Sequence, residues 1–245
     1  LGILIAIPSS IITTNADWYP LLTALLIVVA SSIALAYLYN RIMETIAASL
    51  LFIWSFQLAL QLLETPAYTQ TLAYVLLASL VYAPIAILLR RNKKSRAVFH
   101  HLPVFIVGYA LVAYAVIASV VLRDTKTFIP WIGVVVPLIA TALFTFSASY
   151  FKAAKFSGLW AWAGTLTFTI AFGQSLTLFK VPANYVALAW VGMATFYALF
   201  ERTLFFTSQK ENRHVQKFWS NEFHQPWVIF AFALTALGLF LSLPD

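Results

Sequence analysis

The sequence has no cysteine, which excludes disulfide bonds, thiolate catalysis and metal sites built from cysteine. Charge is also scarce, because Asp, Glu, Lys and Arg make up 9% of the chain, against about 25% in a typical soluble domain. Hydrophobic residues make up 62% of the 245 residues, too many to bury beneath a polar surface. The composition therefore predicts an all-α protein embedded in a lipid bilayer rather than a soluble enzyme.

Long apolar runs divide the chain into about eight expected membrane spans, since a helix needs about 20 apolar residues to cross the hydrocarbon core. We expect one transmembrane helical domain over residues 1–245, as a polytopic bundle. The apolar run 1–13 is half a span long and lacks the basic start of a signal peptide. We interpret it as the second half of a helix whose beginning is missing from the chain, or as a re-entrant segment. The expected spans are 18–39, 42–63, 67–89, 102–122, 128–150, 158–179, 183–200 and 227–243.

Basic residues are distributed unequally between the two sides of these spans. Twelve lie in the loops 40–41, 90–101, 151–157 and 201–226, and three lie on the opposite side. The positive-inside rule places the first group in the cytoplasm, so we expect an integral protein of a bacterial cytoplasmic (inner) membrane. The twelve are Arg41, Arg90, Arg91, Lys93, Lys94, Arg96, Lys152, Lys155, Arg202, Lys210, Arg213 and Lys217, against Arg123, Lys126 and Lys180.

No charged residue falls at mid-depth of an expected span, and Glu44 and Glu64 come nearest, each within a turn of a span end. Proton- and sodium-coupled transporters usually bury carboxylates to hold the coupling ion, and retinal chemistry needs a buried lysine. The absence of charged residues at mid-depth therefore argues against an ion-coupled transporter and against a retinal protein. The spans also lack the residues expected for intramembrane hydrolysis. A pathway without carboxylates suits a neutral or anionic solute, although a purely structural helix bundle has the same pattern.

The four histidines, which are His100, His101, His214 and His224, all fall on the side predicted to be cytoplasmic. Imidazole binds both metal ions and haem. None of these residues has a supporting carboxylate or a His-x3-His spacing, so we favour ordinary interfacial histidines over a metal site and expect no cofactor.

Polar side chains inside the spans have two interpretations. Gln57 and Gln61 fall four residues apart on one face, with Glu64 nearly in line, and the span 158–179 is rich in threonine. Such groups either line a water-filled pathway or form hydrogen bonds to a neighbouring helix. We favour the second interpretation. Pro84 and Pro137 fall within spans and are expected to kink them.

The segment 151–175, FKAAKFSGLWAWAGTLTFTIAFGQS, resembles the penultimate helix of the tellurite-resistance/dicarboxylate transporter family, which includes the plant slow anion channels. Phe156-Ser157 and Leu159-Trp160-Ala161-Trp162 match that helix, and Tyr82-Ala83-Pro84 and Ile5-Ala6-Ile7-Pro8 follow the family's order. The resemblance implies helical hairpins whose inner helices surround a central anion pore, usually in trimers. The inner helices would be 1–13, 42–63, 102–122 and 158–179.

Two features depart from the family's pattern. Its gating phenylalanine falls at Gly164, so Phe168 or Trp162 would have to substitute for it. The family's first two helices also have no counterpart upstream, and 227–243 is an additional span.

These observations favour a channel or facilitator for small anions without covalent chemistry, with Gly164, Trp162, Phe168 and Gln57 as pore or gate residues. Its partners would be the bilayer, the anion and its own copies or a larger membrane complex, and not nucleic acid. A second hypothesis is a non-transporting subunit or sensor that docks a partner through the basic run 90–96 and the loop 201–226. A third is a haem- or quinone-associated bundle that uses the histidines.

Overall fold

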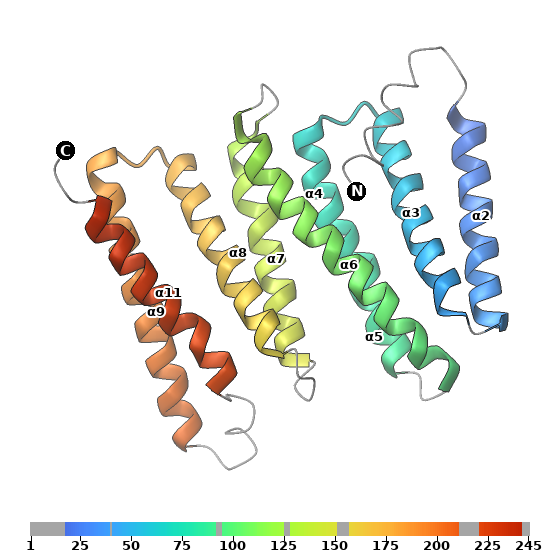
Figure 1. Cartoon of the computed structure of the whole chain (residues 1–245). Helices are drawn as coiled ribbons and strands as arrows, with labels where there is room; N and C mark the ends of the chain where they lie inside the picture. Colours follow the sequence, from blue (N-terminus) through green and yellow to red (C-terminus); the bar gives the residue numbers. More distant parts are fainter. Residues whose placement is uncertain are drawn as a thin grey trace. The chain divides into compact units, whose positions relative to one another are not determined.

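The structure is a computed structural model, and it describes residues 18–39, 41–91, 95–124, 128–150, 157–210 and 221–241 (Figure 1). These residues form helices and short connections, with no strand among them. The chain divides into two compact units, residues 1–117 and 118–245, which are described separately below. The all-α prediction is confirmed for these ranges, while the single domain expected over 1–245 stays a prediction.

The first unit contains α2, α3, α4, the turn η1, α5 and most of α6. Helix α2 packs against α3, to which a short connection joins it. Helix α4, η1 and α5 follow one another without a break and form a single membrane-length segment, where we expected one span at 67–89. The bounds are α2 Trp18–Tyr39, α3 Ile42–Leu62, α4 Ala67–Leu77, η1 Ala78–Tyr82, α5 Ala83–Arg91 and α6 Ser95–Val121.

The turn η1 is a π-helix, in which each carbonyl bonds an N–H five residues further on. The N–H of Ala83 bonds the carbonyl of Ala78 in this way, directly before Pro84. Proline has no N–H and its ring clashes with the carbonyl four residues earlier, so the helix before it must change its bonding pattern. The disturbance expected at Pro84 therefore takes the form of a π-turn.

The second unit contains the short η2, the helices α7, α8, α9 and α11, and the end of α6. Helix α7 packs along α8, and α9 packs along α11, which also contacts α8. Its core is a cluster of buried residues on α9 and α11, with aromatic side chains of α8 packed against it. The bounds are η2 Leu122–Asp124, α7 Pro130–Tyr150, α8 Ser157–Leu178, α9 Ala183–Lys210 and α11 Asn221–Leu241.

Six of the described helical segments are long and apolar enough to cross a membrane, which corrects the expected eight. Helices α8 and α11, which lie at the expected spans 158–179 and 227–243, fall outside this set. Polar residues such as Thr165, Thr169 and Gln174 lower the hydropathy of α8. In α11 the described side chains form a shorter apolar helix, Gln225–Leu241. The partial span 1–13 lies outside the described residues. The six are Tyr19–Tyr39, Ile42–Leu62, Ala67–Arg91, His100–Val121, Pro130–Ala148 and Ala183–Arg202.

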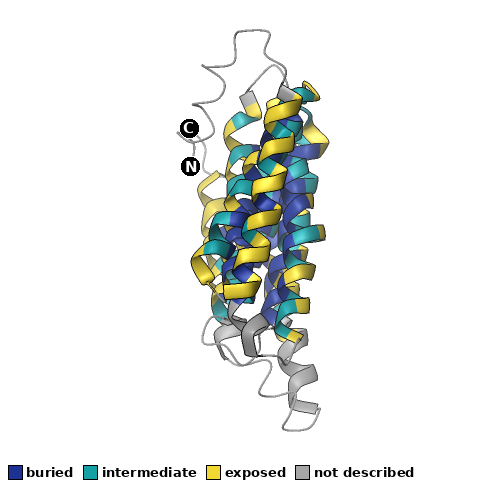
Figure 2. Cartoon of the chain, turned by 90° about the vertical axis from the view of Figure 1, so that its right-hand side faces the viewer, coloured by how far each residue is buried: buried dark blue, intermediate teal, exposed yellow. Residues whose placement is uncertain are grey.

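Large apolar side chains cover much of the outside of the helices. Along α2, Ile27, Ile33 and Leu38 are each more than half exposed, and Figure 2 shows exposed residues along the helices on the face turned to the viewer. Apolar surface in water costs roughly 25 cal/mol per Å², so a monomer in water would not display so much of it. Together with the six membrane-length helices, this surface supports an integral membrane protein.

Two helices end in the same way, with a residue in the left-handed conformation. Glu64 after α3 and Lys180 after α8 both have φ of 50°. After α3, the N–H of Thr65 bonds the carbonyl of Leu60 at 3.0 Å and the N–H of Glu64 bonds that of Gln61 at 2.9 Å. This is a Schellman motif, in which glycine is the usual left-handed residue. Both turns are followed by proline, which prevents the helix from continuing.

Replacing Glu64 with glycine is expected to raise the free energy of unfolding by a few tenths to about 1 kcal/mol, because glycine adopts positive φ without steric strain. Glu64→Ala is the matched control, since it removes the carboxylate but keeps the Cβ atom that causes the strain. Unfolding in mixed detergent micelles measures both variants. Equal midpoints for Glu64→Gly and Glu64→Ala would contradict the expectation.

Candidate functional site

One face of α3 carries buried polar side chains at four-residue spacing. Thr45, Ser49 and Gln57 lie on this face together with Ile53, and all four are buried. Residues four apart on a helix lie above one another, so these groups form a stripe about 18 Å long at a rise of 1.5 Å per residue. The stripe and its partners on the neighbouring helices, which are His100, Tyr82, Tyr74 and Gln70, are called the polar seam below.

At the start of α3, the polar seam consists of Thr45 and His100 from α6. The hydroxyl of Thr45 lies 2.6 Å from Nδ1 of His100, which is 6% exposed. The other ring nitrogen, Nε2, is buried and has no hydrogen-bond partner among the described residues. Leaving a buried polar atom without a hydrogen bond costs about 1–3 kcal/mol of stability. Nε2 is the one atom of the seam in this position among the described residues, so it is open to a further binding partner.

In the middle of the seam, the π-turn η1 is fixed to α3 by a tyrosine. The hydroxyl of Tyr82 donates to the carbonyl oxygen of Ser49 at 2.7 Å, and its ring packs against Phe52 at 6.3 Å between centroids. Gly108 of α6 lies directly against Tyr82, since a Cβ atom there would be 2.7 Å from the Cβ of Tyr82. Only a glycine allows α6 to approach η1 this closely.

At the far end of the seam, three side chains are hydrogen-bonded in series. The hydroxyl of Tyr74 donates to Oε1 of Gln57, and Nε2 of Gln57 donates to Oε1 of Gln70 at 3.3 Å. Nε2 of Gln70 then donates to the carbonyl of Thr65 at 2.7 Å, in the turn after α3. The ring of Tyr74 also packs edge-on against Tyr114 of α6 at 5.6 Å. The seam therefore continues to the end of the span.

The polar seam contains no charged side chain. The described Lys, Arg, Asp and Glu residues of the first unit lie at helix ends or turns, as the sequence predicted. They are Arg41, Glu44, Glu64, Arg90, Arg91 and Arg96. The seam offers hydroxyl, amide and imidazole groups, which can bind a neutral or anionic solute without a buried counter-charge.

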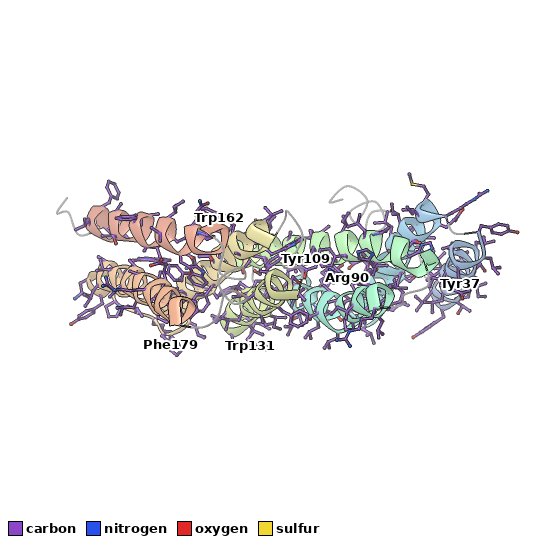
Figure 3. The ribbon with its side chains drawn as sticks, turned by 90° about the horizontal axis from the view of Figure 1, so that it is seen from below. Tyr37, Arg90, Tyr109, Trp131, Trp162 and Phe179 are labelled. Carbon is purple, nitrogen blue, oxygen red and sulfur yellow. The ribbon has the colours of Figure 1, made fainter. Side chains whose placement is uncertain are left out.

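Gln57 is the one sequence-predicted pore residue in the first unit. The others, Trp162, Gly164 and Phe168, belong to the second unit. Trp162 is labelled in Figure 3, and its ring centroid lies 5.9 Å from that of Phe230 on α11. The ring centroids of Phe168 and Tyr197 lie 6.2 Å apart. The rings of Trp162 and Phe168 both border the aromatic cluster around Tyr197. Gly164 instead lies against α7, where a Cβ atom would be 3.1 Å from the hydroxyl of Thr145. The pore and gate roles of these residues stay predictions.

The threonines of α8 bond backbone carbonyls and neighbouring helices. Thr167 lies 2.8 Å from Thr141 of α7, and Thr169 lies 2.9 Å from the hydroxyl of Tyr197 on α9. Thr167 also donates to the carbonyl of Ala163 at 2.9 Å. These bonds join α8 to α7 and α9, which is the helix-packing role expected by default.

The structure describes the side chains of two of the four histidines. His100 is buried in the polar seam and His101 is half-buried. His214 lies outside the described residues, as does the side chain of His224 at the start of α11. Within the described ranges, no group of three or more His, Asp or Glu residues has a geometry that could hold a metal ion.

Sequence reasoning found Gln57 but missed its partners Tyr74 and Gln70, as well as Thr45 and Ser49. The available signal was the spacing of Thr45, Ser49 and Gln57 in multiples of four, which predicts one face of a helix. The partners could not be assigned, because tyrosines recur on several sides of the segment 67–91. Comparisons with protein families, curated proteins and solved structures found no match for the chain.

Proposed function

We propose that the protein is a membrane channel or facilitator for small anions, with its path along the polar seam of the first unit. The observation that carries the proposal is the uncharged, buried series of donors and acceptors along α3, which ends at the unpartnered Nε2 of His100. Anions are held in proteins by N–H and O–H donors, and buried carboxylates would repel them. The resemblance to slow anion channels points to the same solute class.

His100 would supply the first donor for the solute. When Nδ1 accepts a hydrogen bond from the Thr45 hydroxyl, the ring proton is on Nε2, which then offers an N–H group in a buried position. A hydrogen bond to a charged partner contributes about 1.5–3 kcal/mol, enough to offset part of the dehydration of an anion. Arg90 lies in the last turn of α5, next in the chain to the start of α6, which carries His100. Its charge adds positive potential that raises the local anion concentration.

Beyond His100, the seam residues bond one another and would have to exchange these bonds for bonds to the solute. Tyr82, Tyr74 and Gln57 each make a hydrogen bond worth about 0.5–1.5 kcal/mol. In our proposal, this bonded arrangement is the closed state. The π-turn η1 carries Tyr82, and π-turns are frequent at functional sites. Rearrangement of η1 would release Tyr82 from α3 and open this part of the seam.

Replacing His100 with leucine is expected to lower the anion flux at least about tenfold, since the loss of one hydrogen bond to an ion is worth more than 1.4 kcal/mol. The measurement is halide efflux from liposomes containing the purified protein, with empty liposomes as background. His101→Leu is the matched control, because His101 is adjacent and stands outside the seam, and it should retain flux.

Two results would argue against the proposal. Equal flux from His100→Leu and the wild type would remove His100 from the path. Wild-type flux no higher than that of empty liposomes would favour the non-transporting subunit, in which the seam serves only to hold the helices together. An absorption band in the Soret region of the purified protein would instead favour the haem-associated bundle.

A further inference from the structure

The sequence of the second unit repeats part of the first at a constant distance along the chain. Residues 42–78 align without a gap with residues 158–194, each with the residue 116 positions later, and 12 of the 37 pairs are identical. The identical residues of the first unit are Ala47, Leu50, Phe52, Phe56, Leu60, Leu62, Pro66, Ala67, Leu72, Ala73, Val75 and Ala78. The helices follow the same spacing, because α4 begins at Ala67 and α9 begins at Ala183. Helices α3 and α4 therefore correspond in sequence to α8 and α9.

The turns that end α3 and α8 are built in the same way. Glu64 and Lys180, which are 116 positions apart, both have φ of 50°. Three backbone hydrogen bonds of the first turn recur in the second, with the donor and the acceptor each 116 positions later. The donors and acceptors are Leu63 to Ala59, Glu64 to Gln61 and Thr65 to Leu60 after α3, and Phe179 to Ser175, Lys180 to Thr177 and Val181 to Leu176 after α8. The two units therefore correspond in backbone structure as well as in sequence.

The side chains that join the two helices of each pair also correspond. Phe56 of α3 packs against Tyr74 of α4, with 6.1 Å between the ring centroids. Phe172 of α8 and Trp190 of α9 are each 116 positions later, and their ring centroids lie 5.3 Å apart. Many membrane transporters are built from internal structural repeats. The recurrence of the same contact in both units indicates a repeat of this kind.

Each unit also contains a tyrosine that bonds the backbone of the preceding helix. The hydroxyl of Tyr82 donates to the carbonyl oxygen of Ser49 at 2.7 Å, and that of Tyr197 donates to the carbonyl oxygen of Thr165 at 3.2 Å. Ser49 and Thr165 are 116 positions apart. The corresponding ring contacts are Phe52 with Tyr82 at 6.3 Å and Phe168 with Tyr197 at 6.2 Å between centroids. These two bonds, from Tyr82 to Ser49 and from Tyr197 to Thr165, are called the tyrosine clamps below.

The spacing of 116 changes directly before the tyrosine of each clamp. Ser79 and Thr195 still keep it, and their hydroxyls donate to the carbonyls four residues earlier, at 2.6 Å and 2.9 Å. Tyr82 and Tyr197, however, are 115 positions apart. The first unit therefore has one more residue than the second in this short segment.

The additional residue lies in the π-turn η1. Between Ser79 and Tyr82 the first unit has Leu80 and Val81, whereas the second unit has Phe196 alone. A π-turn spaces its hydrogen bonds five residues apart instead of four, so it takes up one residue without rotating the helix on either side. Helix α9 is α-helical over the corresponding segment. Because Leu80 and Phe196 are the large apolar residues of the two segments, Val81 is the residue without a counterpart.

We propose that the two units are copies of one helical repeat, and that Val81 makes the tyrosine clamp of the first unit the one that opens. A helix with an additional residue has more than one way to place its five-residue bonds, so Tyr82 can leave Ser49 while α4 and α5 stay in place. Tyr197 lacks this freedom, because α9 is bonded regularly and Thr169 lies 2.9 Å from the tyrosine hydroxyl. The role of this opening in transport rests on the proposed function, whereas the repeat and the opening itself do not.

Deleting Val81 tests the repeat. The deletion is combined with Pro84→Leu, because the second unit has Leu199 at the position of Pro84 and a proline would disturb the restored α-helix. We expect the combined variant to keep the unfolding midpoint of Pro84→Leu alone in detergent micelles. Deletion of Phe196 is the matched control, since α9 has no additional residue and the rest of the helix would rotate by about 100°. It should prevent folding, and an equal loss of folded protein from both deletions would overturn the proposal.

Hydrogen exchange of the unmodified chain, followed by mass spectrometry, tests the opening of the clamp. We expect the backbone N–H groups of residues 79–83 to exchange at least about tenfold faster than those of residues 195–198, since η1 opens locally and α9 does not. Pro84→Leu alone should keep this difference, and the further deletion of Val81 should remove it. Equal exchange of the two segments in the unmodified chain would overturn the proposal.

Halide efflux from liposomes connects the opening to transport. Deleting Val81 should lower the flux at least about tenfold relative to Pro84→Leu alone, because the clamp is then held closed. Undiminished flux would overturn the role of the clamp in opening the seam. A lack of flux from the unmodified chain would instead contradict the proposed function, and the exchange rates would still decide whether the clamp opens.

Discussion

Replacing Gly238 with alanine is expected to lower the free energy of unfolding of the second unit by about 1–3 kcal/mol. A Cβ atom on Gly238 would lie 2.6 Å from Cγ2 of Val191 and 3.2 Å from the carbonyl oxygen of Ala187. Valine has one strongly preferred rotamer in a helix, and the carbonyl belongs to the backbone, so neither atom can move aside. Helices α9 and α11 would have to separate to accommodate one methyl group.

Gly192 provides the matched control for this substitution. It follows Val191 on α9, and a Cβ atom there would meet nothing within 4 Å. Gly192→Ala should therefore leave stability unchanged or raise it by up to about 1 kcal/mol, since alanine favours the helix. Unfolding in detergent, followed by circular dichroism, measures both variants. Equal unfolding midpoints for the two variants would mean that α9 and α11 do not pack as closely as described.

Replacing Gly108 with alanine is expected to have a similar effect on the first unit, again about 1–3 kcal/mol. The added atom would lie 2.7 Å from Cβ and 3.3 Å from Cγ of Tyr82. The Cβ of Tyr82 is fixed to the backbone of η1, so no rotamer change relieves the contact. The π-turn must shift away from α6, which also disturbs the bond from Tyr82 to Ser49 in the polar seam.

Ala110→Val is the control for Gly108→Ala, because Ala110 lies on the same helix with its side chain exposed. It adds more volume than Gly108→Ala but directs it away from the packed interior. Thermal unfolding in detergent should separate the two variants, and the liposome assay should find reduced flux for Gly108→Ala only. A Gly108→Ala protein with wild-type stability would place α6 farther from η1 than described.

Helix positions could be predicted well where polar residues interrupt the apolar runs. The expected spans 18–39 and 42–63 agree with α2 and α3 to within one residue, because Asn40-Arg41 and Glu64-Thr65-Pro66 mark their ends. Agreement is poorer where a helix extends past its apolar part. The span expected at 183–200 lies within α9, which continues beyond it to Lys210. Hydropathy marks the part of a helix that lipid surrounds rather than the end of its hydrogen bonding.

The count of spans and the π-turn show what hydropathy leaves out. Threonines and Gln174 make the mean hydropathy of α8 lower than that of the six membrane-length helices, although its length of 22 residues is similar to theirs. Pro84 indicates that the helix is disturbed near Ala78–Tyr82, but the surrounding apolar run does not show that the change is from four-residue to five-residue bonding.

The candidate site could be predicted only in part, for a related reason. A helix that is apolar on all sides has no polar face to show which residues point inward. Gln57 could be identified because it is a rare polar residue in its span, whereas Tyr74 and Tyr82 lie among other tyrosines. Their roles depend on which helices are neighbours, and that information comes from the three-dimensional structure.

The closest helix pairs in each unit, α2 with α3, α7 with α8 and α9 with α11, are each consecutive among the described helices. Their contacts therefore join residues that leave the ribosome close together in time. Pairing of neighbours requires little loop-closure entropy, and chains dominated by such contacts fold quickly. Each of these hairpins can be completed in the bilayer during synthesis, before the following helices have been translated.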